Sequence, residues 1–266
     1  MHVIAALGHD ASLSRFYEVD WAPIPNLMMD LIVPVLARFM SVYLAGQIFL
    51  LSMLALMLSG ALARNRARFG RWSAFPLIAT PLLDNHVFLV GLKNYIFGIG
   101  VALWALAAWI ALRDRFWPAR YAVSTAFVIV IFFCHLSALG IYGVGILSFE
   151  ILRLWERRRE PWPWRAAEFV AGGLPFLAAA PFLYISPTMS LVTAMYWDQR
   201  GKIDGLFYVV TNYSDAAAFL LIGIFVVAMV WAVRHRVLKF HPLVFVLLVV
   251  GLLIYIALSC VMFDTY

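Results

Sequence analysis

Long apolar blocks separated by short polar segments run through most of the chain. The blocks are about 15–20 residues long or longer, and a helix of that length crosses a hydrocarbon core of about 30 Å. Most of them have no polar face at helical spacing, which a helix on the surface of a soluble domain would need. The pattern therefore predicts an all-α fold, a polytopic transmembrane helix bundle.

Composition supports this interpretation and argues against a nucleic-acid partner. Apolar residues make up 65% of the 266 residues and charged residues only 13%, against roughly 25% charged residues in soluble domains. The net charge of +6 comes from short basic clusters between apolar blocks, which is a membrane-topology signal and not a nucleic-acid footprint. Cys134 and Cys260 stand at the ends of apolar runs, and we interpret both as buried free thiols.

Four clusters hold 15 of the 20 Lys and Arg residues. Short loops rich in Lys and Arg stay in the cytoplasm, so we expect all four clusters inside and two crossings between consecutive clusters. The clusters are Arg64, Arg66, Arg68 and Arg71; Arg113, Arg115 and Arg120; Arg153, Arg157, Arg158, Arg159 and Arg165; and Arg234, Arg236 and Lys239.

This arrangement predicts about eight spans with both chain ends outside. The hairpin formed by the fourth and fifth spans is short; one full span is the alternative there, but it would move one basic cluster outside. Gly172, Gly173, Pro175 and Pro181 predict a break in the sixth span. The expected spans are 43–63, 73–90, 95–112, 121–134, 138–152, 167–187, 216–233 and 242–262.

Residues 1–42 form a separate outer-side segment ahead of the bundle of residues 43–266. Asn26 is a candidate N-cap for an amphipathic helix that runs to about Met40 and is kinked at Pro34. Its apolar stripe (Leu27, Leu31, Val35 and Leu36) opposes Asp30 and Arg38. Such a helix is expected to lie in the membrane interface; a connector buried against the bundle is the alternative.

Catalytic and ligand-binding residues are expected on the outer side, because the centres of the spans carry almost no ionisable groups. The candidates are Glu18, Asp20, Asp84, His86 and His135, whose carboxylates and imidazoles can act as general bases or hold a divalent cation. Solvated loop charges are the alternative for Glu18 and Asp20, and a hydrogen-bonded structural histidine for His135. Lys93 can pair with Asp84 or bind a phosphate.

Three stretches carry a resemblance to a known group. They are RFYEVDWAPIPNLMMDLIVP (15–34), VFLVGLKNYIFGIGVALWALAAWIALR (87–113) and FFCHLSALGIYGVGILSFEIL (132–152). These stretches resemble bacterial multi-spanning proteins that are similar to the GT-C superfamily of membrane glycosyltransferases, which take sugars from polyprenyl-phosphate donors. The resemblance implies a multi-pass enzyme of the bacterial inner membrane, with its site at the outer face and membrane lipid around it.

The resemblance also implies roles for particular residues. An acid in the first outer loop is essential in that superfamily and a second acid often lies in the next outer loop, which makes Asp84, Asp20 and Glu18 the catalytic candidates. The candidates for binding the donor's anionic head are His86, Lys93, Asn94, His135 and Arg38. A divalent cation, where one is used, would offset the charge of the leaving phosphate.

Two further expectations complete the hypothesis. In the superfamily the essential acid follows directly after a first spanning helix, and no such helix precedes Glu18 in this sequence, so we expect a helix upstream of Met1 and no transfer activity from the 266 residues alone. A transporter and a noncatalytic assembly subunit are the alternatives. The broken sixth span favours a transporter, and the otherwise clean midplane favours the glycosyltransferase.

Overall fold

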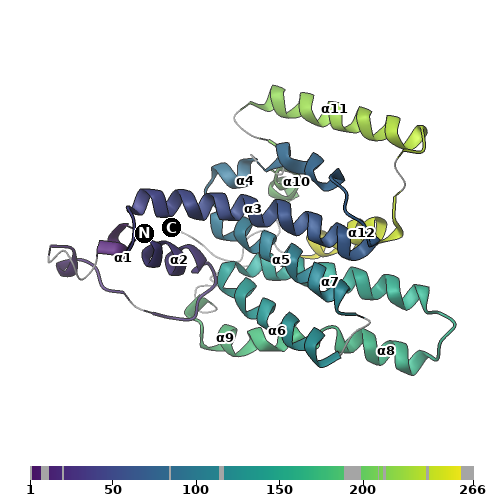
Figure 1. Ribbon diagram of the computed structural model, residues 1–266, viewed down its shortest axis with the longest axis horizontal. Coiled ribbons are helices and arrows are strands. Elements are labelled where there is room, and N and C mark those ends of the chain that lie inside the picture. Colours follow the sequence, from purple (N-terminus) through teal and green to yellow (C-terminus); the bar gives the residue numbers. More distant parts are fainter. Residues whose placement is uncertain are drawn as a thin grey trace. The chain divides into compact units, whose positions relative to one another are not determined.

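The computed structural model describes residues 2–6, 12–19, 21–83, 85–113, 117–188, 199–208, 210–211, 214–237 and 240–258. Every regular element in these residues is a helix, as expected (Figure 1). The longer α-helices are α2 (Met28–Leu36), α3 (Val42–Phe69), α5 (Lys93–Ala111), α6 (Trp117–Cys134), α7 (Leu136–Glu156), α8 (Trp162–Ala171), α10 (Gln199–Phe207), α11 (Asp215–Arg234) and α12 (Pro242–Ala257). The shorter elements are α1 (His2–Ala6), η1 (Leu13–Arg15), η2 (Phe75–Leu82), α4 (His86–Leu89), η3 (Leu174–Ala179) and α9 (Ala180–Ile185).

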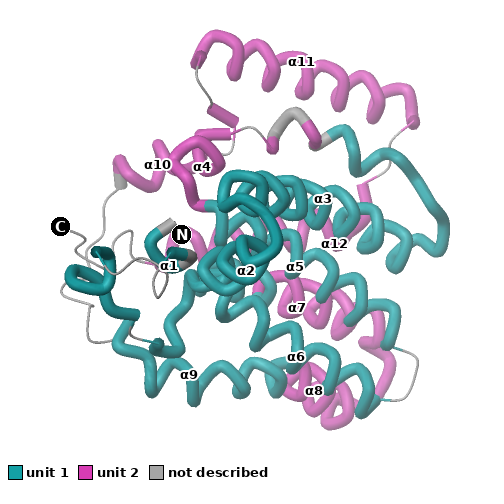
Figure 2. Tube along the Cα trace, turned by 60° about the vertical axis from the view of Figure 1, so that its left-hand side comes forward, with its two compact units in different colours: residues 1–78, 93–143, 173–191 teal, residues 79–92, 144–172, 192–266 magenta. Residues whose placement is uncertain are grey.

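The chain divides into two compact units, coloured separately in Figure 2. Unit 1 holds residues 1–78, 93–143 and 173–191, and unit 2 holds residues 79–92, 144–172 and 192–266. In unit 1, α5 packs against α3 and α6, and α2 lies against all three of these helices. The core of unit 1 is apolar and includes Phe49, Met53, Val128 and Ile131, none of which is exposed to solvent.

Glycines allow α3 and α5 to approach closely. A Cβ added to Gly100 would lie 2.8 Å from the Cβ of Leu56 and 3.0 Å from the backbone nitrogen of Met57, and one added to Gly60 would lie 2.8 Å from the Cβ of Leu103. Small residues at such contacts are typical of helix packing in membranes, because the backbones must come close to gain van der Waals contact. The α3–α5 pair therefore depends on residues without a side chain.

Six segments are long and apolar enough to cross a membrane among the residues described: Val42–Phe69, Lys93–Ala111, Trp117–Cys134, Leu136–Glu156, Trp162–Ile185 and Asp215–Arg234. The chain is thus a helical protein of the multi-pass membrane type. The disputed short hairpin consists of two helices, α6 and α7, of 18 and 21 residues. Only His135 separates them, and each helix is long and apolar enough to cross a membrane by itself. The final expected span is α12, a shorter apolar helix of 16 residues.

The expected span over 73–90 is not a continuous α-helix. The 3-10 helix η2 occupies Phe75–Leu82, and after a break the short α4 begins at His86, with the side chain of Asn85 accepting a hydrogen bond from the backbone of Phe88 at 3.1 Å. Two prolines, Pro76 and Pro81, remove backbone donors from this segment, and an Asn cap starts a new helix. The segment is apolar enough for a span, as predicted, but the prolines and the Asn85 cap interrupt the helix.

The expected break in the sixth span is present. α8 ends at Ala171, Gly172 and Gly173 follow, and η3 then runs as a 3-10 helix from Leu174 to Ala179 before α9 begins. Pro175 stands in the first turn of η3, where its missing N–H is not needed. The unit boundary falls at this break.

The helix that follows Asn26 differs at both ends from the amphipathic helix predicted there. α2 begins at Met28 with Leu27 at the N-cap position and no side-chain cap, and it ends at Leu36, before the predicted Met40. Asn26 instead has a positive φ of 78°, a conformation that Asn tolerates better than most residues. Leu31 and Val35 of the predicted stripe are exposed, whereas Val33 is the buried residue of this helix.

Within each unit, the contacts between helix ends agree with the predicted sides of the membrane. In unit 1, the outer segment at Leu27 donates to the carbonyl of Phe133, at the outer end of α6, at 2.9 Å. In unit 2, Lys202 of α10, in the outer segment expected over 186–215, donates to the carbonyls of Tyr255 and Leu258 at the C-terminal end of α12. Each contact joins two segments that the basic clusters predict to lie on the same side.

Candidate functional site

The structure describes one of the three predicted catalytic carboxylates, Glu18. Asp20 and Asp84 lie outside the described residues. Glu18 is exposed in the segment between η1 and α2, and Arg38 is exposed just after α2. Both are therefore accessible to a ligand from outside the helices of unit 1.

Asn94 is buried and fastens the first segment to the bundle. Its side-chain oxygen accepts from the backbone N–H of Met29 at 2.8 Å, and its side-chain nitrogen donates to the carbonyl of Asn26 at 2.7 Å. The side chain thus satisfies one of the first donors of α2, which no side-chain cap satisfies. Its observed role is structural: Asn94 holds the start of α2 against the start of α5.

His135 lies at the junction of α6 and α7, beside the same end of α5. Its ring centroid is 5.4 Å from that of Tyr95 in an edge-on arrangement, and its Nδ1 accepts from the backbone N–H of Ser137 at 3.1 Å. Burial lowers the pKa of His135 below its usual 6.5, because desolvation disfavours the charged imidazolium. The ring is therefore neutral at pH 7, and its Nε2 is left to carry the proton.

The start of α5 thus gathers three of the predicted ligand-binding residues in unit 1. Lys93 is half-buried and precedes Asn94 and Tyr95 directly, and Tyr95 contacts His135. We name Lys93, Asn94, Tyr95 and His135 the outer-end cluster. It combines one cation, one neutral imidazole and one phenol, a set suited to hydrogen bonding with an anionic or hydroxylated ligand.

His86 belongs to unit 2 and has partners there. Its ring stacks on Tyr208 with centroids 4.5 Å apart, and its backbone N–H donates to the carbonyl of Thr211 at 2.6 Å. These contacts tie α4 to the end of α10 in the outer segment. The predicted convergence of Asp84, His86 and His135 on one site stays a prediction, since the first lies outside the described residues and the other two belong to different units.

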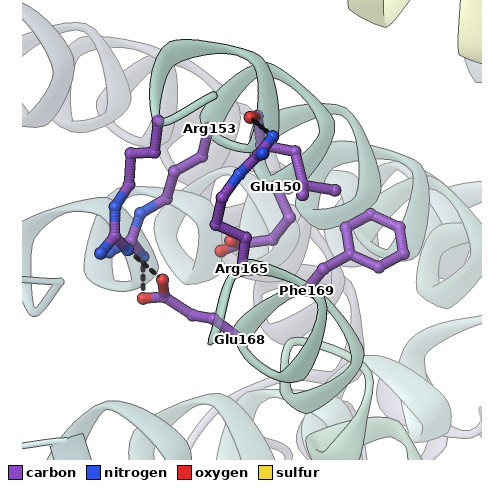
Figure 3. A pocket seen from close by; sticks show the side chains of 7 residues that line it. Glu150, Arg153, Arg165, Glu168 and Phe169 are labelled. Carbon is purple, nitrogen blue, oxygen red and sulfur yellow. Dashed lines mark hydrogen bonds and ion pairs between the residues drawn. The ribbon is translucent and has the colours of Figure 1, made fainter. Parts of the chain in front are cut away.

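Sequence reasoning missed a network of charged residues where α7 ends and α8 begins, in unit 2. Glu168 pairs with Arg153 at 2.6 Å and also with Arg157, and Arg157 reaches Glu160 as well. Arg165 donates to the carbonyl of Leu154, and Glu150, which is only 3% exposed, lines the same small cavity (Figure 3). The signal was available: Glu150 is an ionisable residue inside an expected span, a position that is rarely neutral in function or packing.

The network also shifts the ionisation of its exposed members. The hydrogen bond from Arg157, followed by the nearby arginine charges, lowers the pKa of Glu160, and the same hydrogen bond raises the pKa of Arg157. Both groups are therefore charged across the physiological range. The cavity beside them is lined by these paired residues, which indicates a role in joining the two helices rather than in catalysis.

Unit 1 has a buried cation in the first turn of α6. The guanidinium of Arg120 lies 3.6 Å from the ring centroid of Trp109, and Arg120 is 5% exposed. One turn further along α6, the hydroxyl of Ser124 shares a 2.8 Å hydrogen bond with that of Tyr142. The stacking of a cation on an indole offsets part of the cost of burying it.

A metal site is not assembled by the part of the chain that the structure describes. No group of three His, Cys, Asp or Glu side chains gathers there in a way that would hold an ion. Cys134 is a buried free thiol, as expected, and Cys260 lies outside the described residues.

The comparisons with known proteins give no relative. No family model, no curated protein and no solved structure matches the chain.

Proposed function

We propose that this multi-pass membrane protein is a glycosyltransferase that takes a sugar from a polyprenyl-phosphate donor at the outer face of the bacterial inner membrane. The proposal starts from the resemblance of residues 15–34, 87–113 and 132–152 to the GT-C-like group. All three stretches contribute to the contacts among α2, the start of α5 and the α6–α7 junction in unit 1. That fastening is the observation that carries the proposal.

The arrangement suits a lipid-linked substrate. The polyprenyl tail would remain among the apolar helices, while the phosphate would meet Lys93 or Arg38 at the membrane surface. Each cation would offset the phosphate charge that grows as the bond to the sugar breaks. Asn94, whose amide groups are both engaged, would position the segment and not touch the donor.

The reaction needs one base and one leaving group. A carboxylate of Glu18, Asp20 or Asp84 would accept the proton of the acceptor hydroxyl as its oxygen attacks the anomeric carbon. The bond between that carbon and the phosphate oxygen would break, and polyprenyl phosphate would leave with the electron pair. A divalent cation would stabilise the leaving phosphate where one is bound.

The test is transfer or hydrolysis of polyprenyl-phosphate hexoses and pentoses by native bacterial membranes, in which the protein is present as the cell makes it. We expect Glu18→Gln, Asp20→Asn or Asp84→Asn to lower turnover by at least about a hundredfold for the true base, and Lys93→Gln to weaken donor binding with a smaller effect on turnover. Asp215→Asn is the matched control, because Asp215 is exposed, as Glu18 is, and lies on the predicted outer side. Turnover that no variant of the three carboxylates changes would refute the proposal.

The break between α8 and η3 favours a transporter as the second candidate. Interrupted helices with freed backbone carbonyls are the usual binding elements of transporters, and here Gly172, Gly173 and Pro175 interrupt one. Uptake of a labelled sugar or ion into vesicles, abolished by Gly173→Leu and unaffected by the three carboxylate substitutions, would favour transport over transfer.

A further inference from the structure

Residues 153–165 comprise the last turn of α7, the connection and the first turn of α8, and are called the α7–α8 loop below. They carry arginines of two kinds. Arg153, Arg157 and Arg165 are engaged inside the network, with Glu168, Glu160 and the carbonyl of Leu154 as partners. Arg158 and Arg159 stand between them in the sequence but are exposed on the surface of the loop. The network holds the two helix ends together, so it presents the exposed pair on a fixed support.

Three exposed tryptophans flank Arg158 and Arg159 in the sequence. Trp155, Trp162 and Trp164 are 68%, 63% and 75% exposed, although an indole in water is costly. The guanidinium of Arg158 lies 5.4 Å from the ring of Trp155, and that of Arg165 lies 5.5 Å from the ring of Trp162. Exposed indoles beside cations favour the headgroup region of a bilayer, where the ring finds an apolar side and its N–H a polar one.

The charge of the segment selects the kind of headgroup. Residues 153–165 include five arginines and two glutamates, hence a net charge of +3. α7 and α8 are parts of two candidate spans, and their facing ends carry this segment. A basic, tryptophan-rich segment at the end of a span lies in the layer where anionic phospholipids are concentrated.

We propose that the α7–α8 loop is a docking surface for anionic phospholipid headgroups, with Arg158 and Arg159 as phosphate contacts and Trp155, Trp162 and Trp164 as interfacial anchors. Pro161 and Pro163 support this role, since they limit the conformations of the loop between the anchors. The glutamates of the network keep Arg153 and Arg157 away from the lipid. The surface is independent of any glycosyl transfer, so its test and that of the proposed function can fail separately.

The experiment is a titration of the purified full chain in detergent, followed by native mass spectrometry. The ligands are phosphatidylglycerol, phosphatidylcholine and inorganic phosphate. We expect the wild-type chain to retain phosphatidylglycerol in preference to the other two. A basic residue near an anionic surface changes affinity by about fivefold, so Arg158→Gln with Arg159→Gln should weaken phosphatidylglycerol binding by about tenfold or more.

Two further variants make the result specific. Arg158→Lys with Arg159→Lys keeps the charge and should keep most of the binding. Arg234→Gln with Arg236→Gln removes the same charge from another exposed basic cluster and should change binding by less than about twofold. Both substituted arginine pairs lie outside the salt-bridge network, so the helix ends should stay folded, which circular dichroism would verify.

Several outcomes would overturn the assignment. Equal retention of phosphatidylcholine would show that headgroup charge is not recognised. Competition by inorganic phosphate at matched concentration would indicate a free-phosphate site, and an equal loss in the Arg234 and Arg236 variant would indicate a general effect of net charge. Absence of phosphatidylglycerol binding, together with capture of an acidic peptide, would assign the loop to a protein partner instead.

Discussion

α5 and α11 are both apolar spans, yet they differ in how they are packed. Of the most apolar 18-residue stretch of each helix, 56% is buried in α5 and 6% in α11. α5 is the less hydrophobic of the two, with a mean hydropathy of 1.6 against 2.7. Half of its buried residues are small, Gly98, Gly100, Ala102, Ala105 and Ala107, whereas α11 exposes large ones such as Phe219, Leu220 and Val227.

The difference shows that the tendency of a helix to span a membrane and its tendency to pack against other helices are separate properties, which hydropathy alone does not distinguish. High hydropathy makes a helix a good span, because lipid solvates its side chains. Packing against another helix in a membrane brings no hydrophobic gain, so it depends on close backbone approach and on polar contacts. α5 has both, in its glycines and in Asn94, and α11 has neither among its described contacts.

The largest expected effect comes from filling the α3–α5 contact. Gly100→Val would drive new atoms into the Cβ of Leu56 and the backbone of Met57, which cannot move without separating the helices. Overpacking of this kind costs about 1–3 kcal/mol or more. Unfolding of the purified chain by dodecyl sulfate titration should show the loss.

The matched control for this prediction lies in α11. A Cβ added to Gly223 meets no atom within 4 Å, so Gly223→Val should change stability by no more than about 0.5 kcal/mol. Equal losses in the two variants would mean that α5 and α11 are packed alike, and the comparison would be broken.

The second prediction concerns the polar contact of α5. Asn94→Ala leaves the N–H of Met29 and the carbonyl of Asn26 without their partner, and a buried unsatisfied group costs about 1–3 kcal/mol. The first segment should detach more often, so trypsin should cleave after the exposed Arg38 several times faster. Asn85→Ala, which removes an amide cap from α4 in unit 2, should leave that rate unchanged.

These residues also mark what the sequence could and could not predict. Hydropathy and the basic clusters predicted α3, α5, α6, α7 and α11 well, because solvation of a span depends on local composition. The prediction of one helix over 73–90 was wrong, because Pro76, Pro81 and the Asn85 cap interrupt the helix although the residues are apolar enough for a span. The role of Asn94 was out of reach: its partners are 65 and 68 residues away, and no local rule links them.

The candidate site was predicted only in part, again because local sequence patterns do not determine long-range contacts. Lys93, Asn94 and His135 do lie at one end of unit 1, because helix ends joined by short turns must share a side of the membrane. The pairing of Glu168 with Arg153 and Arg157 depends on how α8 faces α7, which the spacing of these residues leaves undetermined. An acidic residue fifteen positions after an arginine has no periodic signature.

The third prediction tests ionic packing in unit 2 against glycine packing in unit 1. Glu168→Gln removes the charge that Arg153 and Arg157 share, and a partly exposed pair of this kind contributes about 1 kcal/mol or less. The variant should be destabilised less than Gly100→Val and more than Glu160→Gln, which loses only the contact with Arg157. Hydrogen exchange in residues 162–171 should be faster in Glu168→Gln than in Glu160→Gln.

The smallest expected effect is a dependence on pH at the outer end of α6. Burial lowers the pKa of His135 below 6.5, so the unfolded chain binds a proton there more readily than the folded one. Stability from this residue is therefore full above pH 6.5, falls as the pH drops through 6.5 and levels off below the folded pKa. His135→Gln should remove that part of the loss between pH 7.5 and about 5 in thermal unfolding of the detergent-solubilised chain. His235, exposed at the end of α11, is the matched control. A pH profile that His235→Gln changes as much as His135→Gln would remove the distinction between a packed and an unpacked helix end.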